Sequence, residues 1–303
     1  MSLITEYRPE AFSEIVGNRE LIVALDSVLL RESGVPHAFL FSGDTGCGKT
    51  TLGRIVRNCL GCSDNNYREI DSADFRGIDT IRDIRQSSRL AGFQGGVRVF
   101  LLDECHQLSR DAQNALLKGL EDPPKHVYYI LCTTDPQKLL PTIVGRCSHF
   151  QVTPLSEREI VKLLRRVSKA YGSTIPKDVC IQIAEDSFGR PRDALQLLDK
   201  IIDLPEDKML SVVTQEAERQ SEIIELCRAL IKMEPWSVIA PILRGLKGKD
   251  PEKIRRAIRG YCVSILEKKD EPRAFLILDA LDTPLFTDGY SMLVSACYFV
   301  LNG

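Results

Sequence analysis

The sequence has little that would place the protein in a membrane or outside the cell. It contains no run of about 18 apolar residues, so no membrane-spanning helix is expected. The N-terminal stretch MSLITEYRPEAF lacks a basic segment followed by an apolar one and does not resemble a signal peptide. We therefore expect a cytoplasmic protein with no membrane partner.

An excess of charge of one sign is also missing. The 40 basic and 42 acidic residues give a formal net charge of −2 over 303 residues. This balance provides no general attraction to nucleic acid, so a DNA-binding surface would have to gather its basic residues locally. The apolar fraction of 44% is ordinary for a globular protein, and the length allows about one to three domains.

The chain contains ten cysteines but lacks the pattern of a disulfide framework. Most of them lie in apolar runs such as YYILCTTD and MLVSACYFV, which is typical of reduced, buried thiols. Cys59 and Cys62 have the spacing of a metal-binding pair, but no third or fourth Cys or His follows nearby. Because a structural zinc ion needs about four ligands, we expect no zinc and favour two thiols at a helix end.

Short apolar runs alternate with helical patterns from about residue 20 to 150. The runs HAFLFSG, VRVFLLDE and VYYILCTT are rich in β-branched and aromatic residues, as expected for strands buried on both faces. Between them lie helical patterns over residues 48–60, 78–91 and 109–121. This alternation predicts an α/β domain with a parallel sheet.

After residue 153 the pattern becomes entirely helical. Three helices are predicted over residues 156–171, 176–187 and 191–203, and their starts carry helix-entry signals in Ser156 with Glu159, in Pro176 and in Pro191. Further helices from residue 205 are interrupted near Pro235, Pro251 and Pro272. We predict an α/β domain over residues 1–153, a small helical domain over 154–204 and an all-helical domain over 205–303.

A phosphate-binding loop is the strongest motif. It fits the pattern G-x-x-x-x-G-K-[ST], follows a predicted strand and opens a predicted helix. Its backbone amides would point at phosphate oxygens, Lys49 would reach the β- and γ-phosphates of a nucleotide, and Thr50 would hold Mg²⁺. The strand and helix context disfavours a chance glycine-rich turn. The expected nucleotide-binding residues are Gly43, Asp44, Thr45, Gly46, Cys47, Gly48, Lys49, Thr50 and Thr51.

Two more strand ends carry candidate catalytic groups. Asp103, at the end of VRVFLLDE, can bind Mg²⁺, and Glu104 can orient and deprotonate water. The alternative, a pair at a helix N-terminus, is less favoured beside a phosphate loop. Thr133 and Thr134 end the third strand and could sense the γ-phosphate or the water. A turn rich in Thr and Asp explains these two residues equally well.

These motifs, in this order, resemble the AAA+ clamp-loader ATPases, and the bacterial DNA polymerase III gamma/tau family most of all. The resemblance covers about residues 5–200 and rests on five separated stretches. These are EYRPEAFSEIVGN, GDTGCGKTT, VRVFLLDECHQLSRDAQNALLKGLEDPP, YYILCTTDPQKLLPTIVGRC and GRPRDALQLLD.

The resemblance implies roles for residues that the motifs alone do not assign. The adenine base would lie among Tyr7, Arg8, Pro9, Val16 and Gly17. Thr134 matches the position named sensor 1, and Arg192 matches the sensor-2 arginine that reaches the γ-phosphate from the helical lid. Arg146 matches an arginine finger that acts on the nucleotide of a neighbouring subunit. A guanidinium placed against developing phosphoryl charge can accelerate hydrolysis by about 10³–10⁵.

The sequence departs from this family in three ways. Gly145 replaces the serine that usually precedes the finger arginine, although the guanidinium itself is present. The family's four-cysteine zinc module is reduced to Cys59 and Cys62. The chain also ends after the third predicted domain, whereas gamma/tau proteins often continue, and this favours a compact loader of phage type.

A row of arginines predicts a DNA contact. Arg82, Arg85 and Arg89 share one face of the helix predicted over residues 78–91, and Arg76 precedes it. Such a row can track phosphates without reading bases. By itself the row is better explained as a solvated helix face that pairs with Asp79 and Asp83, but the resemblance places this helix along a DNA chamber. Lys118 and Lys138 match family positions that touch DNA or couple it to the ATP site.

The resemblance implies an ATP- and Mg²⁺-dependent hydrolase that loads a sliding clamp on primer–template DNA. It would act with other loader subunits, in a ring or spiral pentamer whose collar is the C-terminal domain, in the cytoplasm of a bacterial or phage-infected cell. Because the finger acts between subunits, the isolated chain should hydrolyse ATP poorly. Two alternatives remain, another DNA-linked AAA+ ATPase for recombination or helicase loading, and a stator subunit that does not hydrolyse ATP.

Overall fold

A computed structural model describes residues 2–31, 34–72, 77–248, 251–266, 270–283 and 289–302. The chain forms two compact units, residues 1–210 and 211–303. The units divide within one long helix, α10 (Glu206–Ile231), a few residues beyond the boundary that we predicted at residue 205. The division of the first unit at residue 153 stays a prediction.

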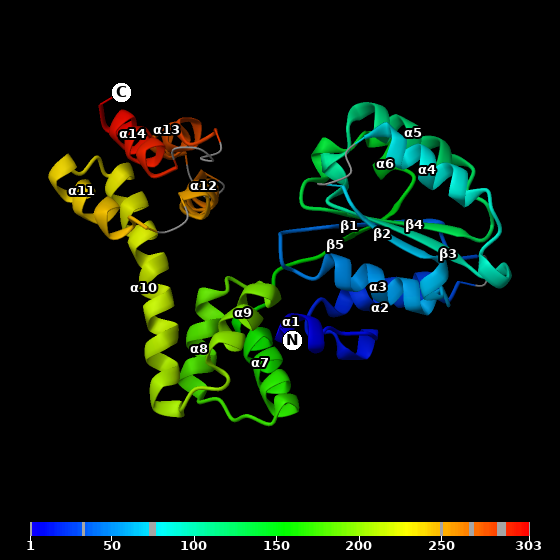
Figure 1. Cartoon of the computed structure of the whole chain (residues 1–303), viewed down its shortest axis with the longest axis horizontal. Coiled ribbons are helices and arrows are strands. Elements are labelled where there is room, and N and C mark those ends of the chain that lie inside the picture. Colours follow the sequence, from blue (N-terminus) through cyan, green and yellow to red (C-terminus); the bar gives the residue numbers. More distant parts are fainter. Residues whose placement is uncertain are drawn as a thin grey trace. The chain divides into compact units, whose positions relative to one another are not determined.

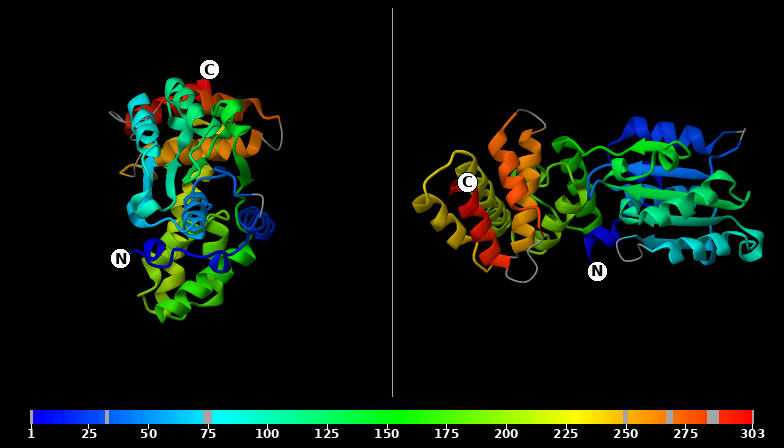
Figure 2. Two further views of the ribbon diagram at one scale, coloured as in Figure 1. Left: turned by 90° about the vertical axis from the view of Figure 1, so that its right-hand side faces the viewer. Right: turned by 90° about the horizontal axis from the view of Figure 1, so that it is seen from above.

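The first unit contains a five-stranded parallel sheet in the order β2-β3-β4-β1-β5 (Figures 1 and 2). Three strands, β1 (Ala38–Ser42), β3 (Arg98–Asp103) and β4 (Val127–Thr133), fall on the predicted apolar runs. The edge strands β2 (Tyr67–Asp71) and β5 (Ser148–Gln151) were not predicted. The parallel order brings the C-terminal ends of β1, β3 and β4 to one edge of the sheet, where a site can form.

Two helical layers cover the sheet (Figure 1). Helices α2 (Arg19–Leu29) and α3 (Lys49–Cys59) pack on one face, where Phe39, Phe41 and Leu101 are buried. Helices α4 (Ile78–Ser88), α5 (Arg110–Glu121) and α6 (Pro141–Val144) cover the other face, which buries Leu40 and Leu102. Neighbouring residues of one strand thus enter different cores, and the interiors of the central strands are largely apolar.

Short helical turns link these layers. They are α1 (Leu3–Glu6), η1 (Phe12–Glu14), η2 (Asp64–Asn66), η3 (Phe93–Gly95), η4 (Cys105–Gln107) and η5 (Pro136–Lys138). The turn η4 directly follows β3, and η5 follows β4. Both therefore lie at the edge of the sheet that carries the candidate catalytic residues.

Three helices complete the first unit, and they agree with the predicted ones. They are α7 (Glu157–Tyr171), α8 (Lys177–Asp186) and α9 (Pro191–Ile201). Ser156 caps α7 as predicted, and its backbone N–H and hydroxyl both donate to Oε2 of Glu159, at 2.9 and 2.8 Å. The backbone N–H of Leu3 donates to Asp199 in α9, at 3.1 Å, and so ties the N-terminal segment to this helical part.

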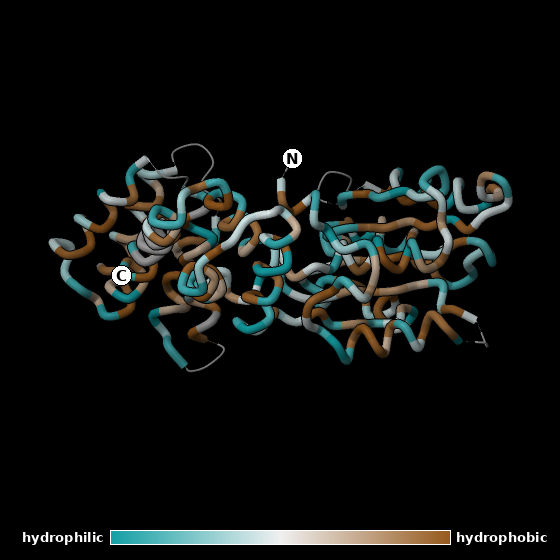
Figure 3. Tube along the Cα trace, turned by 90° about the horizontal axis from the view of Figure 1, so that it is seen from below, coloured by the Kyte–Doolittle hydropathy of each residue, from teal (hydrophilic) through white to brown (hydrophobic). Residues whose placement is uncertain are grey.

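The second unit is helical throughout the part of it that the structure describes. The helices α11 (Trp236–Gly245), α12 (Pro251–Leu266), α13 (Pro272–Ala280) and α14 (Gly289–Asn302) pack with the end of α10 around one apolar core. Trp236 packs edge-on against Tyr298 with ring centroids 5.1 Å apart, so its indole ring contributes to the packing of this unit. Figure 3 shows apolar segments recurring along the helices, as an internal core requires.

All ten cysteines are free, and most of them are buried. Burial raises the pKa of Cys147 to about 12 and that of Cys262 to about 11. Cys59, at the end of α3, is the exposed one. Among the described residues, no helix is long and apolar enough to cross a membrane.

Candidate functional site

The phosphate loop connects β1 to α3, and its glycines are required by its shape. Gly43 has φ +145°, and a Cβ added there would lie 2.2 Å from the backbone oxygen of Val152. Gly48, which precedes the first turn of α3, has φ +102°. The loop therefore curls tightly at the N-terminal end of α3, where a helix favours an anion.

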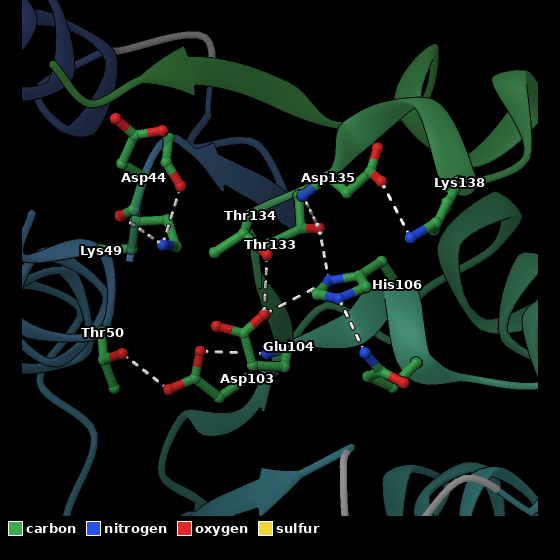
Figure 4. Close-up of polar contacts among 12 residues, drawn as sticks. Asp44, Lys49, Thr50, Asp103, Glu104, His106, Thr133, Thr134, Asp135 and Lys138 are labelled. Atoms are coloured by element: carbon green, nitrogen blue, oxygen red, sulfur yellow. Dashed lines mark hydrogen bonds and ion pairs between the residues drawn. The ribbon is translucent and has the colours of Figure 1, made fainter. Parts of the chain in front are cut away.

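Lys49 points back into this loop (Figure 4). Its side chain is buried, and Nζ donates to the backbone oxygens of Gly43 and Asp44, both at 2.9 Å. These contacts hold the ammonium inside the curve of the loop. The geometry suits a cation that neutralises bound phosphate.

Thr50 and Asp103 join the loop to the end of β3. The Thr50 hydroxyl donates to Oδ2 of Asp103 at 2.6 Å, and Oδ1 of Asp103 accepts the backbone N–H of Glu104 at 3.0 Å. A hydroxyl and a carboxylate are oxygen donors of the kind that Mg²⁺ prefers. The residues present therefore fit the magnesium site that we predicted.

Glu104 lies beside Asp103 in a left-handed backbone conformation, with φ +47°. Its Oε2 accepts a hydrogen bond from the Thr134 hydroxyl at 3.2 Å, so the ends of β3 and β4 are linked (Figure 4). Thr133 is fully buried, and its hydroxyl accepts the backbone N–H of Asp135 at 3.0 Å. The two threonines thus have different contacts.

His106, in η4, is a polar residue of this cluster that we did not predict. Its Nδ1 lies 3.0 Å from the Thr133 hydroxyl and 3.3 Å from Oε2 of Glu104. Burial lowers the pKa of His106, although the nearby Glu104 carboxylate opposes that shift. His106 belongs to the sequence stretch DECH, but its contact with the Glu104 carboxylate depends on the turn η4 that follows β3. The sequence alone therefore did not reveal it.

A cavity of about 350 Å³ adjoins the phosphate loop. Its walls include most of the predicted nucleotide-binding and catalytic residues, namely Tyr7, Arg8, Pro9, Val16, Thr45, Gly46, Cys47, Gly48, Lys49, Thr50, Thr51, Asp103, Glu104 and Arg192. Gly17, Gly43, Asp44 and Thr134 were also predicted but are not among the residues that line it. A Cβ at Gly17 would lie 2.3 Å from Cδ2 of Leu155, which makes Gly17 a packing position beside the cavity.

Several wall residues were missed by sequence reasoning. Apolar walls come from Ile4, Leu163 and Leu195, which the helical pattern places on buried faces without showing that those faces meet a cavity. Arg54 also lines the cavity, where its guanidinium donates twice to Glu69, at 2.9 and 2.7 Å. The strand that carries Glu69 was not predicted, so this pair had no signal in the sequence.

Arg192 lies where the helical part meets the phosphate loop. Its backbone N–H donates to the Gly46 oxygen at 3.3 Å, and a Cβ at Gly46 would lie 3.3 Å from Cβ of Arg192. Helix α9 therefore starts against the loop, and the Arg192 side chain borders the cavity.

Arg146 is not among the residues that line the cavity. Its guanidinium donates to Oε1 of Glu121 at 2.7 Å and to the Thr142 backbone oxygen at 3.0 Å. The side chain is 37% exposed, so it is accessible from outside the chain.

Five of the six predicted DNA-contacting residues are described by the structure, and all five are at least partly exposed on the first unit. Helix α4 ends at Ser88 and not at residue 91, so Arg89 is its C-terminal cap. Arg82 is exposed and pairs with Asp79 at 3.0 Å, while Arg85 is half-buried. Lys118 is exposed on α5, and Lys138 pairs with Asp135 at 3.1 Å. Arg76 lies outside the described residues.

The two cysteines with metal-type spacing differ in exposure. Cys59 is exposed, whereas Cys62 is buried and its thiol contacts the Ser63 backbone oxygen at 3.5 Å. Within the described part of the chain, no group of three or more His, Cys, Asp or Glu side chains could hold a metal ion. The expectation of no zinc stays a prediction.

Comparisons with solved structures identify the fold. Structures of RuvB from Thermotoga maritima match with 18–20% sequence identity. The RuvB Holliday junction branch migration motor gives a TM-score of 0.58 over 74% of this chain and 79% of the other. A RuvB point mutant gives 0.58 over 95% and 91%. The parallel sheet, the phosphate loop and the helical parts that follow define an AAA+ fold with additional helical domains.

Sequence comparisons narrow the resemblance to subunits of DNA polymerase III. The family model described as DNA polymerase III, delta subunit, matches residues 69–156. The gamma/tau subunit of Mycobacterium tuberculosis is 34% identical over 67% of this chain, and the tau subunit of Bacillus subtilis is 31% identical over 89%. The Escherichia coli tau subunit is 35% identical over 66%. The chain is thus similar to DNA polymerase III gamma/tau subunits, the family that its motifs resemble.

The match covers only part of these relatives. The chain spans 39% of the length of the mycobacterial protein, 52% of the Bacillus protein and 34% of the Escherichia protein.

Proposed function

We propose that this chain is an ATPase subunit of a sliding-clamp loader. ATP binding would let it help open a ring clamp and place it on primer–template DNA, and hydrolysis would release the loaded clamp. The observation that carries the proposal is the pairing of Thr50 with Asp103, beside Lys49 and Glu104, in a chain similar to gamma/tau subunits. This constellation has the parts that phosphoryl transfer to water requires.

Each residue of the site has a role in this proposal. Lys49 and the amides of the phosphate loop hold the β- and γ-phosphates, and Arg192 approaches the γ-phosphate from α9. Thr50 and Asp103 would hold Mg²⁺, which neutralises phosphate charge when it is bound. Glu104 orients the attacking water and accepts its proton, and Thr134 holds the Glu104 carboxylate. The adenine base lies among Tyr7, Arg8, Pro9 and Val16, with Gly17 packed behind them.

Arg146 acts on the nucleotide of a neighbouring subunit. Two facts support this role: the side chain is not among the residues that line the cavity of its own chain, and it is partly exposed. Its pairing with Glu121 would keep the guanidinium in place until a neighbour's phosphate competes for it. The isolated chain should therefore turn over ATP slowly and hydrolyse it faster in a ring or spiral pentamer with companion subunits.

DNA would bind through arginines and lysines of the first unit. Arg82, Arg85 and Arg89 would follow phosphates, with Arg76 beside them, while Lys118 and Lys138 would contact the backbone or relay DNA binding to the ATP site. This contact is independent of base sequence, as recognition of a primer–template junction requires. Such a loader would work without zinc, in the cytoplasm of a bacterial or phage-infected cell.

Two other functions remain as alternatives. Another DNA-linked AAA+ ATPase would share the fold, as the RuvB structures do, but the gamma/tau similarity over 89% of the chain favours a loader. A stator subunit would not need a working phosphate site. The placement of Lys49, Thr50, Asp103 and Glu104 speaks against that alternative.

The deciding experiment measures steady-state ATP hydrolysis by the full chain, with and without primed DNA, a cognate clamp and companion subunits. A loader should be stimulated strongly only when clamp and primed DNA are both present, and Arg146→Ala should remove the stimulation. Stimulation by DNA that is indifferent to the clamp would indicate another AAA+ machine. Absence of turnover in every mixture would favour the stator.

A further inference from the structure

His106 occupies an unusual place for a residue without an assigned role. It lies two residues after Glu104 in the turn that follows β3, and its side chain is only 8% exposed. The ring is enclosed by polar groups from two strand ends and from its own turn (Figure 4). A buried imidazole in such a position needs a partner for each ring nitrogen.

The contacts of His106 define which nitrogen carries the proton. The Gln107 side-chain amide nitrogen lies 2.9 Å from Nε2 of His106. An amide nitrogen can only donate, so Nε2 accepts, and the neutral ring carries its proton on Nδ1. Nδ1 then donates toward the Thr133 hydroxyl at 3.0 Å and Oε2 of Glu104 at 3.3 Å.

The surroundings keep the ring neutral. Burial lowers the pKa of His106, and the ammonium groups of Lys138 and Lys49 act in the same direction, whereas Glu104 and Asp135 oppose them. A neutral Nδ1–H can hold a carboxylate in place by a hydrogen bond without adding a positive charge to the site. Both contacts to Glu104, from Thr134 and from His106, are made to Oε2. Under the proposed function, these two contacts leave Oε1 to accept the proton of the attacking water.

We propose that His106 is a positioning residue that fixes the Glu104 carboxylate through its Nδ1–H while it braces the Thr133 hydroxyl at the end of β4. His106 is not among the residues that line the cavity, and it acts through Glu104. The inference rests on the proposed hydrolysis of ATP, and it adds a residue that the strand-end motif leaves without a role.

Three substitutions separate this role from simple packing. Asn carries a donor nitrogen close to the place of Nδ1, and Gln carries one close to the place of Nε2, whereas Ala carries neither. His106→Ala and His106→Gln should therefore lower kcat about 10- to 100-fold, the loss that a misplaced catalytic group causes. His106→Asn should keep most of the activity. The KM for MgATP should stay within about twofold in all three, because substrate binding does not use this contact.

The matched control is His126→Asn. Nε2 of His126 donates one hydrogen bond to the Leu90 backbone oxygen, at 3.0 Å, and the ring is remote from the strand-end carboxylates in sequence and in contacts. Its kcat and KM should equal those of the unchanged chain. Equal activity of the Asn and Gln variants of His106, or wild-type kcat in His106→Ala, would overturn the proposal.

A second measurement does not depend on activity. In the full chain labelled with ¹⁵N-histidine, the His106 signals, assigned by their loss in His106→Asn, should show a neutral ring protonated on Nδ1. Protonation on Nε2 would contradict the proposal. If the unchanged chain shows no turnover in any mixture, the proposed function fails, and the ring tautomer still decides the role of His106.

Discussion

At the scale of single residues, the strand-end site depends on side chains held in unusual backbone positions. Glu104 has φ +47° and Asn18, next to the cavity, also has φ +47°. A left-handed conformation at a residue other than glycine costs about 1 kcal/mol or more and persists where its surroundings hold it. At Glu104, Asp103 accepts the backbone N–H, while Thr134 and His106 contact the carboxylate. The backbone and the side chain of this residue are therefore both held in place.

Lys49→Ala is the sharpest test of the phosphate loop. The ammonium lies within the loop and is hydrogen-bonded to its carbonyl oxygens, so its loss removes charge where phosphate charge must be neutralised. We expect kcat/KM for ATP to fall at least about 100-fold. Stopped-flow binding of a fluorescent ATP analogue measures the loss of nucleotide affinity, and steady-state hydrolysis measures the loss of turnover. Lys125→Ala, at an exposed lysine in the turn before β4, should leave both unchanged.

The sequence was sufficient to predict the residues that belong to local motifs. Lys49 and Thr50 open the helix after one strand, and Asp103 and Glu104 stand at the end of another. Their meeting at one sheet edge can therefore be deduced from the chain. His106 could not be deduced in this way. Its role depends on the turn of η4 and on a hydroxyl from another strand, and neither has a signal in the local sequence.

At the scale of elements, the predicted DNA-contacting arginines of α4 and its C-terminal cap differ in their exposure to solvent. Arg82 and Arg89 are exposed, whereas Arg85 is half-buried. If they contact DNA phosphates, the double variant Arg82→Ala/Arg89→Ala should weaken binding to primed DNA. It should also reduce the slope of log K against log salt by about 0.9 per lost contact. Fluorescence anisotropy at several salt concentrations measures both effects.

The control for α4 is Arg165→Ala, which removes an exposed arginine from α7. It changes the net charge without touching the proposed contact row. An equal loss of slope in the control would show that the chain attracts DNA only through its general charge, and the role assigned to α4 would then be wrong.

Helix α12 contains an arginine with a structural task. Arg255 pairs with Glu252 at 2.7 Å and donates to the backbone oxygens of Leu281 and Asp282 at the end of α13, at 2.8 and 3.1 Å. Arg255→Met removes these bonds and leaves Glu252, which is mostly buried, with one partner fewer. We expect the second unit to lose about 3 kcal/mol of stability, as after breaking a buried ion pair.

Urea denaturation of the full chain, followed by near-ultraviolet circular dichroism of Trp236, would measure that loss. Arg256→Met is the matched control, because Arg256 is 70% exposed and also pairs with Glu252. A similar loss in both variants would contradict the role given to the buried guanidinium.

The elements themselves were unequally predictable. Strands β1, β3 and β4 have largely apolar interiors because both faces of the sheet are covered there. The edge strand β2 buries only Ile70, and β5 has no fully buried residue. Neither sequence therefore shows the continuous apolar run by which the central strands were predicted. The prediction for α4 ran three residues too long, because Arg89, Leu90 and Ala91 continue a helical composition after the helix has ended at Ser88.

At the scale of the whole molecule, the role proposed for Arg146 means that ATP hydrolysis at one subunit requires a residue from its neighbour. Chains with Lys49→Ala lack a working cavity but keep Arg146, and chains with Arg146→Ala have the opposite defect. Each variant alone should be inactive in the assembled loader. A mixture of the two should recover a fraction of the ATPase activity, since some cavities then receive a finger from a neighbour. Failure of the mixture to recover activity, with assembly verified by light scattering, would show that Arg146 acts within its own chain.

Proline positions predicted the C-terminal helices well, because α11, α12 and α13 begin at or directly after Pro235, Pro251 and Pro272. The boundary between the two units was harder to predict from the sequence. The two units separate inside α10, a continuous helix whose sequence has no break at residue 210. Only the packing of the helix against different cores reveals where one unit ends.

The uneven exposure of the thiols also has a practical consequence. Cys59 is exposed at the C-terminal end of α3, the helix that Lys49 begins, whereas the other nine thiols are buried or half-buried. A maleimide dye would therefore attach there first, without prior removal of the remaining cysteines. The label would sit on the helix that receives the phosphates, and the fluorescence of the unmutated protein could report nucleotide arrival in real time.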